Sequence, residues 1–210
     1  MSKPAQPIVL YGFKISGHSH RAELMLRLLD LPYEFRVVDL PGGEQKTDRF
    51  LRLNPFGTVP VIDDGGTIVS DSVAILVYLA LKYDESRRWL PAEPAAAAAV
   101  QRWLSAAQGP VAFGPAQARF IKLFGAPMDH ARAVQIAQRF LGVLEGQLQG
   151  RDYLVGASPT IADVAIYSYV SVAPEGEISL EPYKVIRTWL DRMARLPGFE
   201  PMPASKPKAA

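Results

Sequence analysis

Three short segments carry residue types that can take part in chemistry. Residues 14–21, Lys-Ile-Ser-Gly-His-Ser-His-Arg, place two hydroxyls and two imidazoles between an apolar run and a helical stretch. Residues 70–72, Ser-Asp-Ser, directly precede another helical stretch, and residues 54–61 contain a Val-Pro pair within a strand-like run. Hydroxyl and carboxylate side chains at a helix start are usually caps. The free backbone N–H groups at such a start also bind anions, so these segments are candidates for holding an anionic ligand.

Other kinds of site find little support in the sequence. The chain has no cysteine, which excludes disulfides, thiolate metal sites and a sulfur nucleophile of its own. His18 and His20 lack further obvious ligands, so we expect no metal. A Ser-His-Asp triad is not favoured, because no nucleophile-elbow motif is present. The net charge of +2, with acids and bases interspersed, disfavours nucleic acid as a partner.

The elements that position these segments change character near residue 84. Before that point, strand and helix signals alternate. We expect strands at 8–13, 33–40, 58–63 and 67–69, and helices at 19–31, 47–53 and 72–83. The first strand, helix and strand form a right-handed parallel unit, and the last two strands form a hairpin. After a charged, proline-bearing stretch only helical signals follow, at 95–104, 116–124, 131–148, 161–172 and 185–196.

This order predicts an α/β domain at residues 1–83, a linker at 84–94 and an all-α domain at 95–210. Together with four motifs, it resembles the cytosolic glutathione transferase family over essentially the whole chain. The resemblance implies a thioredoxin-like first domain (βαβ-ββα), which holds glutathione, and a helical second domain. The chain resembles serine-type, bacterial-like members of this family, and the resemblance does not assign it to one glutathione transferase class. The motifs are residues 14–21, 54–61, 70–72 and 158–164.

The resemblance implies that Ser16 activates the thiol of glutathione. Lowering a thiol pKa from ~8.5 by about two units requires roughly 2.7 kcal/mol. A hydroxyl hydrogen bond to the charged sulfur contributes ~1.5–3 kcal/mol, and a helix amino terminus ~0.3–1 kcal/mol. His18, Ser19 and Tyr11 rank lower as catalytic residues. Ser19 is alternatively the helix cap, Tyr11 a core residue, and His18 either a group that tunes the thiolate or a solvated side chain.

The same resemblance implies which residues hold glutathione, the co-substrate. The family's Val-Pro bond is cis, which turns the backbone of Val59 ahead of Pro60 outward to pair with the cysteinyl backbone. Ser72 and the free N–H groups beside it would bind the γ-glutamyl carboxylate, and Asp71 its amine. Most members have Glu or Gln where Asp71 stands, so the shorter side chain of Asp71 extends less far toward the amine. Lys46 is the expected partner of the glycine carboxylate, with a solvated loop lysine as the alternative.

Fewer roles can be assigned in the second domain. Thr160 and Asp163 have the spacing of a capping box, to which we give a structural role only. In the first domain, we expect His20 at the surface and Arg21 paired with an acid. The candidates for the electrophile site, each with a core role as the alternative, are Trp103, Phe113, Arg119 and Phe120.

The implied activity is transfer of glutathione to a small hydrophobic electrophile, or glutathione-dependent reduction of an organic hydroperoxide. The alternative is a ligand- or protein-binding member of the fold without turnover; the intact motifs favour the enzyme. A third possibility, an isomerase that uses glutathione as a cofactor, fits the serine loop only loosely, because His18 stands where that class usually has a cysteine. The helix at 72–83 is too apolar to face water, which predicts a homodimer. Without a signal-like start or an apolar run of membrane length, we expect a cytoplasmic protein with no membrane partner.

Overall fold

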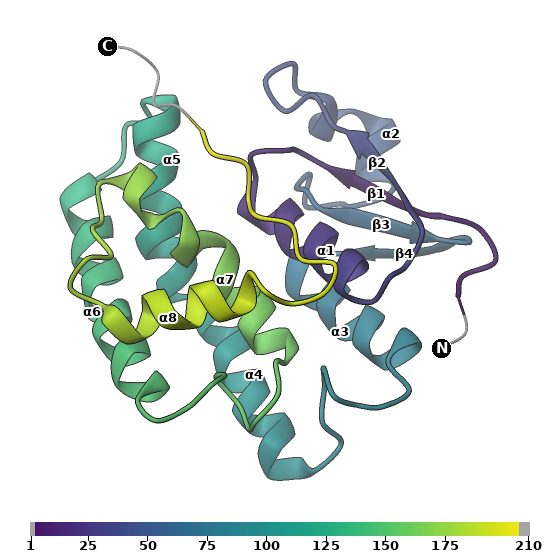
Figure 1. Cartoon of the computed structure of the whole chain (residues 1–210). Helices are drawn as coiled ribbons and strands as arrows, with labels where there is room; N and C mark the ends of the chain where they lie inside the picture. Colours follow the sequence, from purple (N-terminus) through teal and green to yellow (C-terminus); the bar gives the residue numbers. More distant parts are fainter. Residues whose placement is uncertain (1–2, 206–210) are drawn as a thin grey trace.

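A computed structural model describes residues 3–205 of the chain. The elements of its first half are β1 (Ile8–Gly12), α1 (Gly17–Leu28), β2 (Tyr33–Val37), η1 (Glu44–Lys46), α2 (Asp48–Leu51), β3 (Val61–Asp64), β4 (Thr67–Ser70) and α3 (Ser72–Tyr83). The four strands form one sheet in the order β2-β1-β3-β4 (Figure 1). β1 and β2 are parallel, whereas β3 is antiparallel to both β1 and β4. This is the predicted βαβ-ββα arrangement of a thioredoxin-like domain.

Every regular element described after residue 84 is a helix, as predicted. A π-helical turn, η2 (Ala112–Ala116), lies between α4 (Pro94–Gln108) and α5 (Gln117–Phe124) and contains Pro115, which cannot donate a backbone hydrogen bond. The helices are α4 (Pro94–Gln108), η2 (Ala112–Ala116), α5 (Gln117–Phe124), α6 (His130–Leu148), α7 (Ile161–Ser171), η3 (Ala173–Gly176) and α8 (Lys184–Met193).

Two element starts differ from the prediction, each for a local reason. α1 begins at Gly17 rather than at residue 19, because Ser16 is the cap and its side chain accepts the backbone N–H of Ser19. The expectation that Ser19 caps this helix is therefore wrong. β3 begins at Val61 rather than at residue 58: Pro60 has no N–H to donate to a ladder, and the Thr58 carbonyl accepts from the side-chain amide of Asn54 at 2.8 Å.

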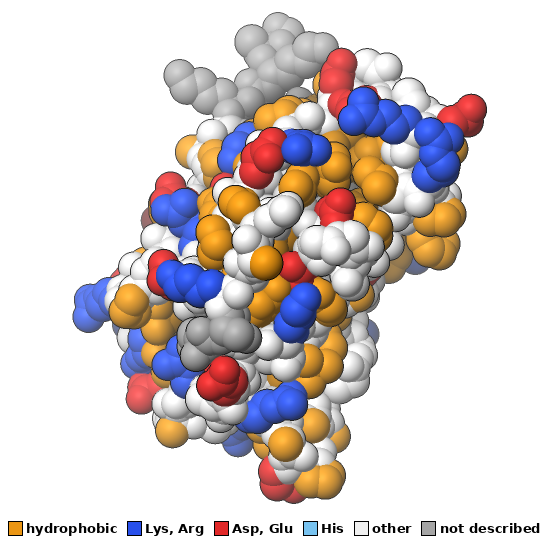
Figure 2. Space-filling model, turned by 90° about the vertical axis from the view of Figure 1, so that its right-hand side faces the viewer, with side chains coloured by type: hydrophobic (Ala, Val, Ile, Leu, Met, Phe, Trp, Pro, Cys, Tyr) orange, Lys and Arg blue, Asp and Glu red, His pale blue; other side chains and the backbone are white. Residues whose placement is uncertain are grey.

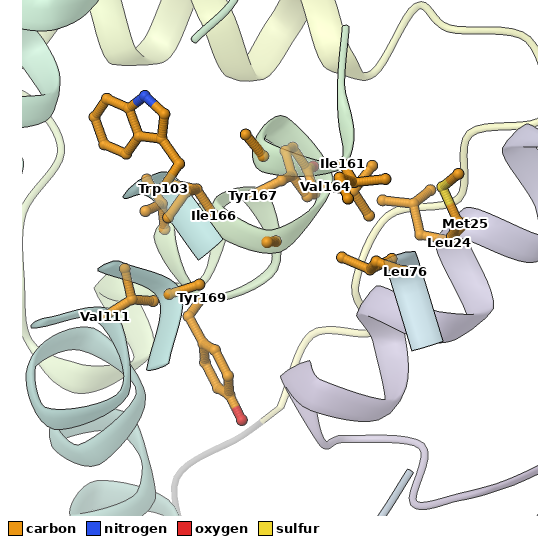
Figure 3. Packing of buried hydrophobic residues seen from close by; sticks show 14 of the residues in the cluster. Leu24, Met25, Leu76, Trp103, Val111, Ile161, Val164, Ile166, Tyr167 and Tyr169 are labelled. Carbon is orange, nitrogen blue, oxygen red and sulfur yellow. The ribbon is translucent and has the colours of Figure 1, made fainter. Parts of the chain in front are cut away.

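One continuous apolar core joins the two halves. α1 and α3 lie between the sheet and the helices of the second half (Figure 1). α7 is the central helix, and every residue from Ile161 to Val170 is buried. Figure 3 shows Leu24 and Leu76 of the first half on one side of the cluster and Val164 of α7 between them and the rest of the second half. Because so much apolar surface is shared, we expect the two halves to unfold together; the division at residues 84–94 remains a prediction.

The predicted capping box at the start of α7 is confirmed. The Thr160 side chain caps the helix, and the carboxylate of Asp163 accepts the backbone N–H of Thr160 at 2.9 Å. The same carboxylate accepts the backbone N–H of Leu154 and the indole N–H of Trp189, both at 3.0 Å. Burial raises the pKa of Asp163, and these hydrogen bonds oppose that effect. The residue thus ties three segments of the second half together, in agreement with a structural role.

The surface is of mixed charge. On the face that Figure 2 presents, acidic and basic side chains are interspersed among apolar ones. Among the described residues, no helix has both the length and the apolar character needed to cross a membrane. Within the same residues, no group of three or more histidine, aspartate or glutamate side chains is placed to hold a metal ion.

Candidate active site

A cavity of about 600 Å³ lies between the start of α1, the loop before β3, and α5. Both halves of the chain contribute to its wall, and most of the lining side chains are apolar. The predicted site residues that line it are Ser16, His18, Val59, Arg119 and Phe120. The fold therefore brings the thiol-activating candidate, one glutathione-binding candidate and two electrophile-site candidates to a single space.

Ser16 presents a hydroxyl to this cavity at the first turn of α1. It is the N-cap residue, with φ −84° and ψ 121°, and its oxygen accepts the backbone N–H of Ser19 at 3.3 Å. Ser19 itself is buried, and its hydroxyl accepts the backbone N–H of Phe13 at 3.1 Å. The Ser19 hydroxyl is thus committed to local structure. The Ser16 hydroxyl lies at a helix amino terminus, where the partial positive charge favours an anion.

His18 is neutral and its proton position follows from its neighbours. Its Nδ1 lies 3.0 Å from Nη1 of Arg21 and 3.1 Å from Oγ of Ser72. Arginine can only donate, so Nδ1 accepts and the ring proton is on Nε2. Burial, with a smaller contribution from Arg21, lowers the pKa of His18 to about 3. His18 is therefore a hydrogen-bonding group of the cavity wall rather than a cation.

Arg21 does not pair with an acid, contrary to prediction. Its side chain is fully buried, and Nη1 donates to Ser72 at 3.3 Å while Nη2 donates to the carbonyl of Ala107 at 3.4 Å. Burial lowers the pKa of Arg21 to about 10, so the group is charged at neutral pH. A buried guanidinium without an ion-pair partner among residues 3–205 is costly. It gives the space beside Ser72 a positive potential.

The expectation that His20 lies at the surface is also wrong. The ring is buried and joins α1 to two distant segments, with Nδ1 at 2.8 Å from Oγ of Ser168 and Nε2 donating to the Glu200 carbonyl at 2.9 Å. Burial lowers the pKa of His20. Nε2 must carry the ring proton, because a carbonyl only accepts. His20 is a structural link between the halves.

Val59 and Pro60 adopt the conformation that the family resemblance implies. The peptide bond between them is cis. Val59 lines the cavity, and within residues 3–205 its backbone N–H and C=O form no backbone hydrogen bond. These groups are free to pair with an extended ligand as an added strand would.

Asp71 and Ser72 form the start of α3. The Asp71 carboxylate caps the helix by accepting the backbone N–H groups of Val73 at 2.8 Å and Ala74 at 3.0 Å, and its other oxygen accepts from the Gln108 side chain at 2.6 Å. Asp71 is exposed and adopts a φ of 76°, which is unusual for a residue with a side chain. Ser72 is buried against His18 and Arg21, so this helix start is connected to that of α1.

Besides Ser19, Pro60, Asp71 and Ser72, the first-half candidates Tyr11 and Lys46 lie outside the cavity wall. The Tyr11 hydroxyl accepts from Arg36 at 3.3 Å, and the ring packs in a small core cluster with Val38 and Phe50, as expected of a core residue. Lys46 is exposed in η1, and its neighbour Gln45 is the residue of this loop that lines the cavity.

The second-half candidates separate into two groups. Phe120 lines the cavity, whereas Trp103 lines a separate cavity between α4 and α6, and Phe113 is exposed outside both. Arg119 lines the cavity with its guanidinium already engaged. It donates to the carboxylate of Glu175 at 2.7 Å, to the carbonyl of Ile15 at 2.7 Å and to the hydroxyl of Ser205 at 2.8 Å.

Tyr169, the α7 residue that reaches the cavity, was not predicted from the sequence. Its ring is 7% exposed and lies edge-on to the ring of His18, with the centroids 5.2 Å apart. One signal was available: a tyrosine in a buried helix needs a partner for its hydroxyl. The nearly uniform apolar character of α7 gave no indication of the direction in which this side chain points.

Fold and site together define a class of protein: a thioredoxin-like domain with a hydroxyl at the start of its first helix, closed by a helical domain that completes one cavity. Residues 15–82 match the family described as "Glutathione S-transferase, N-terminal domain", and residues 127–197 match "Glutathione S-transferase, C-terminal domain". The chain belongs to the glutathione S-transferase family.

Individual relatives agree over nearly the full length. The chain is 33% identical to "Glutathione S-transferase-like protein tpcF" of Aspergillus fumigatus, over 93% of this chain and 94% of that protein. It is 32% identical to "Glutathione S-transferase 3" of Zea mays, over 96% and 95%. The crystal structure of a glutathione S-transferase from Pseudomonas fluorescens is 37% identical, with a TM-score of 0.88 over 94% of this chain and 99% of that one.

Proposed function

We propose that this glutathione transferase holds the thiol of its co-substrate glutathione as a thiolate through Ser16. One observation carries the proposal: the Ser16 hydroxyl lies in the cavity at the amino terminus of α1, and its oxygen already accepts the N–H of Ser19. Its own proton remains to be donated to sulfur. Catalysis would then come from electrostatic stabilisation and positioning, with no covalent bond to the protein.

The tripeptide would lie along the edge of the first domain. The free backbone of Val59 would pair with the cysteinyl backbone, and Ser72, with the charge of Arg21 behind it, would hold the γ-glutamyl carboxylate. Asp71 would accept from the amine, since its carboxylate is exposed at the same helix start. We assign the glycine carboxylate to Lys46, which would have to reach it from the exposed face of η1.

The electrophile would be small and apolar. The wall opposite Ser16 is formed by α5, where Phe120 and Phe124 are 49% and 47% exposed. Arg119 is the charged side chain on that wall, and its hydrogen bonds to the protein leave little for a ligand. Reduction of an organic hydroperoxide by glutathione is the second activity that such a site supports.

The test is a titration of glutathione into the wild type and Ser16→Ala. Affinity and the thiolate absorbance of the bound tripeptide would be recorded across pH. We expect the wild type to bind glutathione with a thiol pKa well below that of the free tripeptide, and Ser16→Ala to lose that depression. Binding with an unperturbed thiol in the wild type would show that Ser16 is wrongly assigned. No binding at all would favour a protein that keeps the fold without turnover.

We also propose a cytoplasmic homodimer. Ala74, Val77, Tyr78 and Leu81 follow one another at helical spacing on the outer side of α3, and Leu81 is 50% exposed. Phe56, in the loop before β3, is 87% exposed. Such apolar surface is typical of an interface. Leu81→Glu should yield a monomer in sedimentation equilibrium, whereas Met128→Glu, at an exposed position of the α5–α6 loop, should not. The cytoplasm is the compartment in which glutathione maintains reducing conditions.

A further inference from the structure

Tyr169 projects from the centre of the second half onto the loop that carries Ser16. Figure 3 shows its ring extending away from the rest of the apolar cluster, with the hydroxyl directed out of it. The ring lies against Gly17, the residue between Ser16 and His18. A Cβ at position 17 would stand 2.6 Å from Cζ of Tyr169. Any other residue at position 17 would therefore collide with the hydroxyl end of this ring, so Gly17 is what admits Tyr169 to the site.

This contact places the phenol among polar groups of the loop. The hydroxyl end of the ring lies beside Gly17, between Ser16 and His18, and the Ser16 hydroxyl and the backbone N–H of His18 both lower the pKa of Tyr169. An N–H only donates, so the Tyr169 oxygen accepts from His18. Its own proton is then available for the oxygen of Ser16.

Burial keeps the phenol of Tyr169 a donor, against the effect of the charged groups that face the ring. Arg21 lies with Cζ 5.3 Å from the ring centroid, Arg119 approaches from α5, and His18 faces the ring as a neutral imidazole. Burial raises the pKa of Tyr169 and outweighs the opposing effect of the two arginines. The phenol is therefore protonated throughout the neutral range.

We propose that Tyr169 is a positioning residue that donates its proton to Ser16 and so directs the Ser16 proton to the sulfur of glutathione. The inference rests on the proposed role of Ser16. A serine oxygen accepts two hydrogen bonds and donates one. The N–H of Ser19 fills one acceptor position, and the O–H of Tyr169 fills the other. The proton of Ser16 is left with the thiolate as its partner, and hydrogen bonds in such a chain strengthen one another.

The experiment compares Tyr169→Phe with Tyr167→Phe. Phenylalanine at position 169 keeps the ring against Gly17 and removes only the hydroxyl. Tyr167 is the matched control, because it is a tyrosine of the same helix, equally buried, that packs on Trp189 and Phe199 instead. We expect Tyr169→Phe to lower the thiolate fraction of bound glutathione, at a pH below the thiol pKa, by about three- to tenfold. Glutathione affinity and thermal unfolding should match those of Tyr167→Phe.

A double variant separates positioning from direct contact. If Tyr169 acts through Ser16, Tyr169→Phe has no further effect on the thiolate fraction in a Ser16→Ala background. An equal effect in both backgrounds would mean that Tyr169 touches the sulfur itself, and would overturn the positioning role. A wild-type thiolate fraction in Tyr169→Phe, with the loss retained in Ser16→Ala, would overturn this inference alone. If Ser16→Ala also had a wild-type thiolate fraction, the proposed function itself would be overturned.

Discussion

Two helix starts in the first half of the molecule, those of α1 and α3, satisfy their free N–H groups in different ways. α1 is capped by the neutral hydroxyl of Ser16, half-buried in an apolar cavity. α3 is capped by the exposed carboxylate of Asp71, which accepts two backbone N–H groups. Both caps do the same structural work, yet they leave different groups for a ligand. A hydroxyl still has a proton to donate, whereas a carboxylate can only accept.

This difference matches the two ends of the proposed ligand. A developing sulfur anion needs a donor at the first helix start, and an ammonium needs an acceptor at the second. Arg21 connects the two, since it donates to His18 beside the first start and to Ser72 at the second. A cap therefore becomes a functional site through the groups that remain free after the helix has been capped.

The largest effect is expected at the first start. Ser16→Ala removes the donor to sulfur, and we expect kcat/KM for conjugation to fall about 10- to 100-fold, in line with ~1.5–3 kcal/mol for a hydrogen bond to a charged group. Loss of the cap should also lower the free energy of unfolding by ~1 kcal/mol. Steady-state kinetics at fixed pH and urea unfolding measure the two losses.

Ser16→Thr is the control for this prediction. It keeps both the hydroxyl and the capping ability, so most of the activity should return. If Ser16→Thr and Ser16→Ala are equally impaired, the hydroxyl is not the group that matters.

Arg21 tests the connection between the two starts. Arg21→Met keeps an unbranched side chain in the buried space but removes the charge behind Ser72. We expect glutathione affinity to fall about tenfold, a loss of ~1.4 kcal/mol, because the ligand carboxylate loses a nearby positive charge. Calorimetric titration gives the affinity. An unchanged affinity would contradict the idea that this buried charge is neutralised by the ligand.

His18, beside the start of α1, makes the free energy of unfolding depend on pH. Its pKa falls from 6.5 in the unfolded chain to about 3 in the folded protein. Between these values the unfolded state binds the extra proton, so stability rises with pH across this window and is lost on acidification below pH ~6.5. His18→Gln should reduce the slope of unfolding free energy against pH by at most one proton, ~1.4 kcal/mol per pH unit. Urea unfolding at several pH values from about 4.5 to 6.5 measures this slope. The part of the slope that comes from the buried His20 should remain in the variant.

Features with a local cause could be predicted from the sequence. The Thr160–Asp163 box and the helix at residues 72–83 each depend on neighbours within a few residues, whereas the cis Val59–Pro60 bond was implied by the family resemblance of its motif. Strand and helix signals of this kind also set the order of elements, which was enough to predict the fold. Even here the start of α1 was displaced, because two serines three residues apart are equally good caps by type.

Features that depend on contacts between the halves could not be predicted. His20 is buried where Ser168, 148 residues away, donates to its Nδ1 and the Glu200 carbonyl accepts from its Nε2. Tyr169 lies against Gly17, next to Ser16, through the docking of α7 on α1, and nothing in the pattern of α7 sets that rotation. Hydrophobic periodicity identifies a buried face, but it does not identify the partner on the other side.

The smallest effect is expected at the second helix start, and it has a matched control. Asp71→Asn keeps a side-chain oxygen for the cap and removes the charge that would attract the amine of glutathione. We expect affinity to fall only two- to fivefold, about the range of an exposed ion pair. Glu93→Gln makes the same change at α4, where the carboxylate also accepts two backbone N–H groups but lies outside the proposed site. Both variants should lose a little stability through the helix dipole, and only Asp71→Asn should weaken glutathione binding. Equal affinities in the two variants would reduce Asp71 to a cap and confine ligand recognition at this helix start to Ser72 and the charge of Arg21.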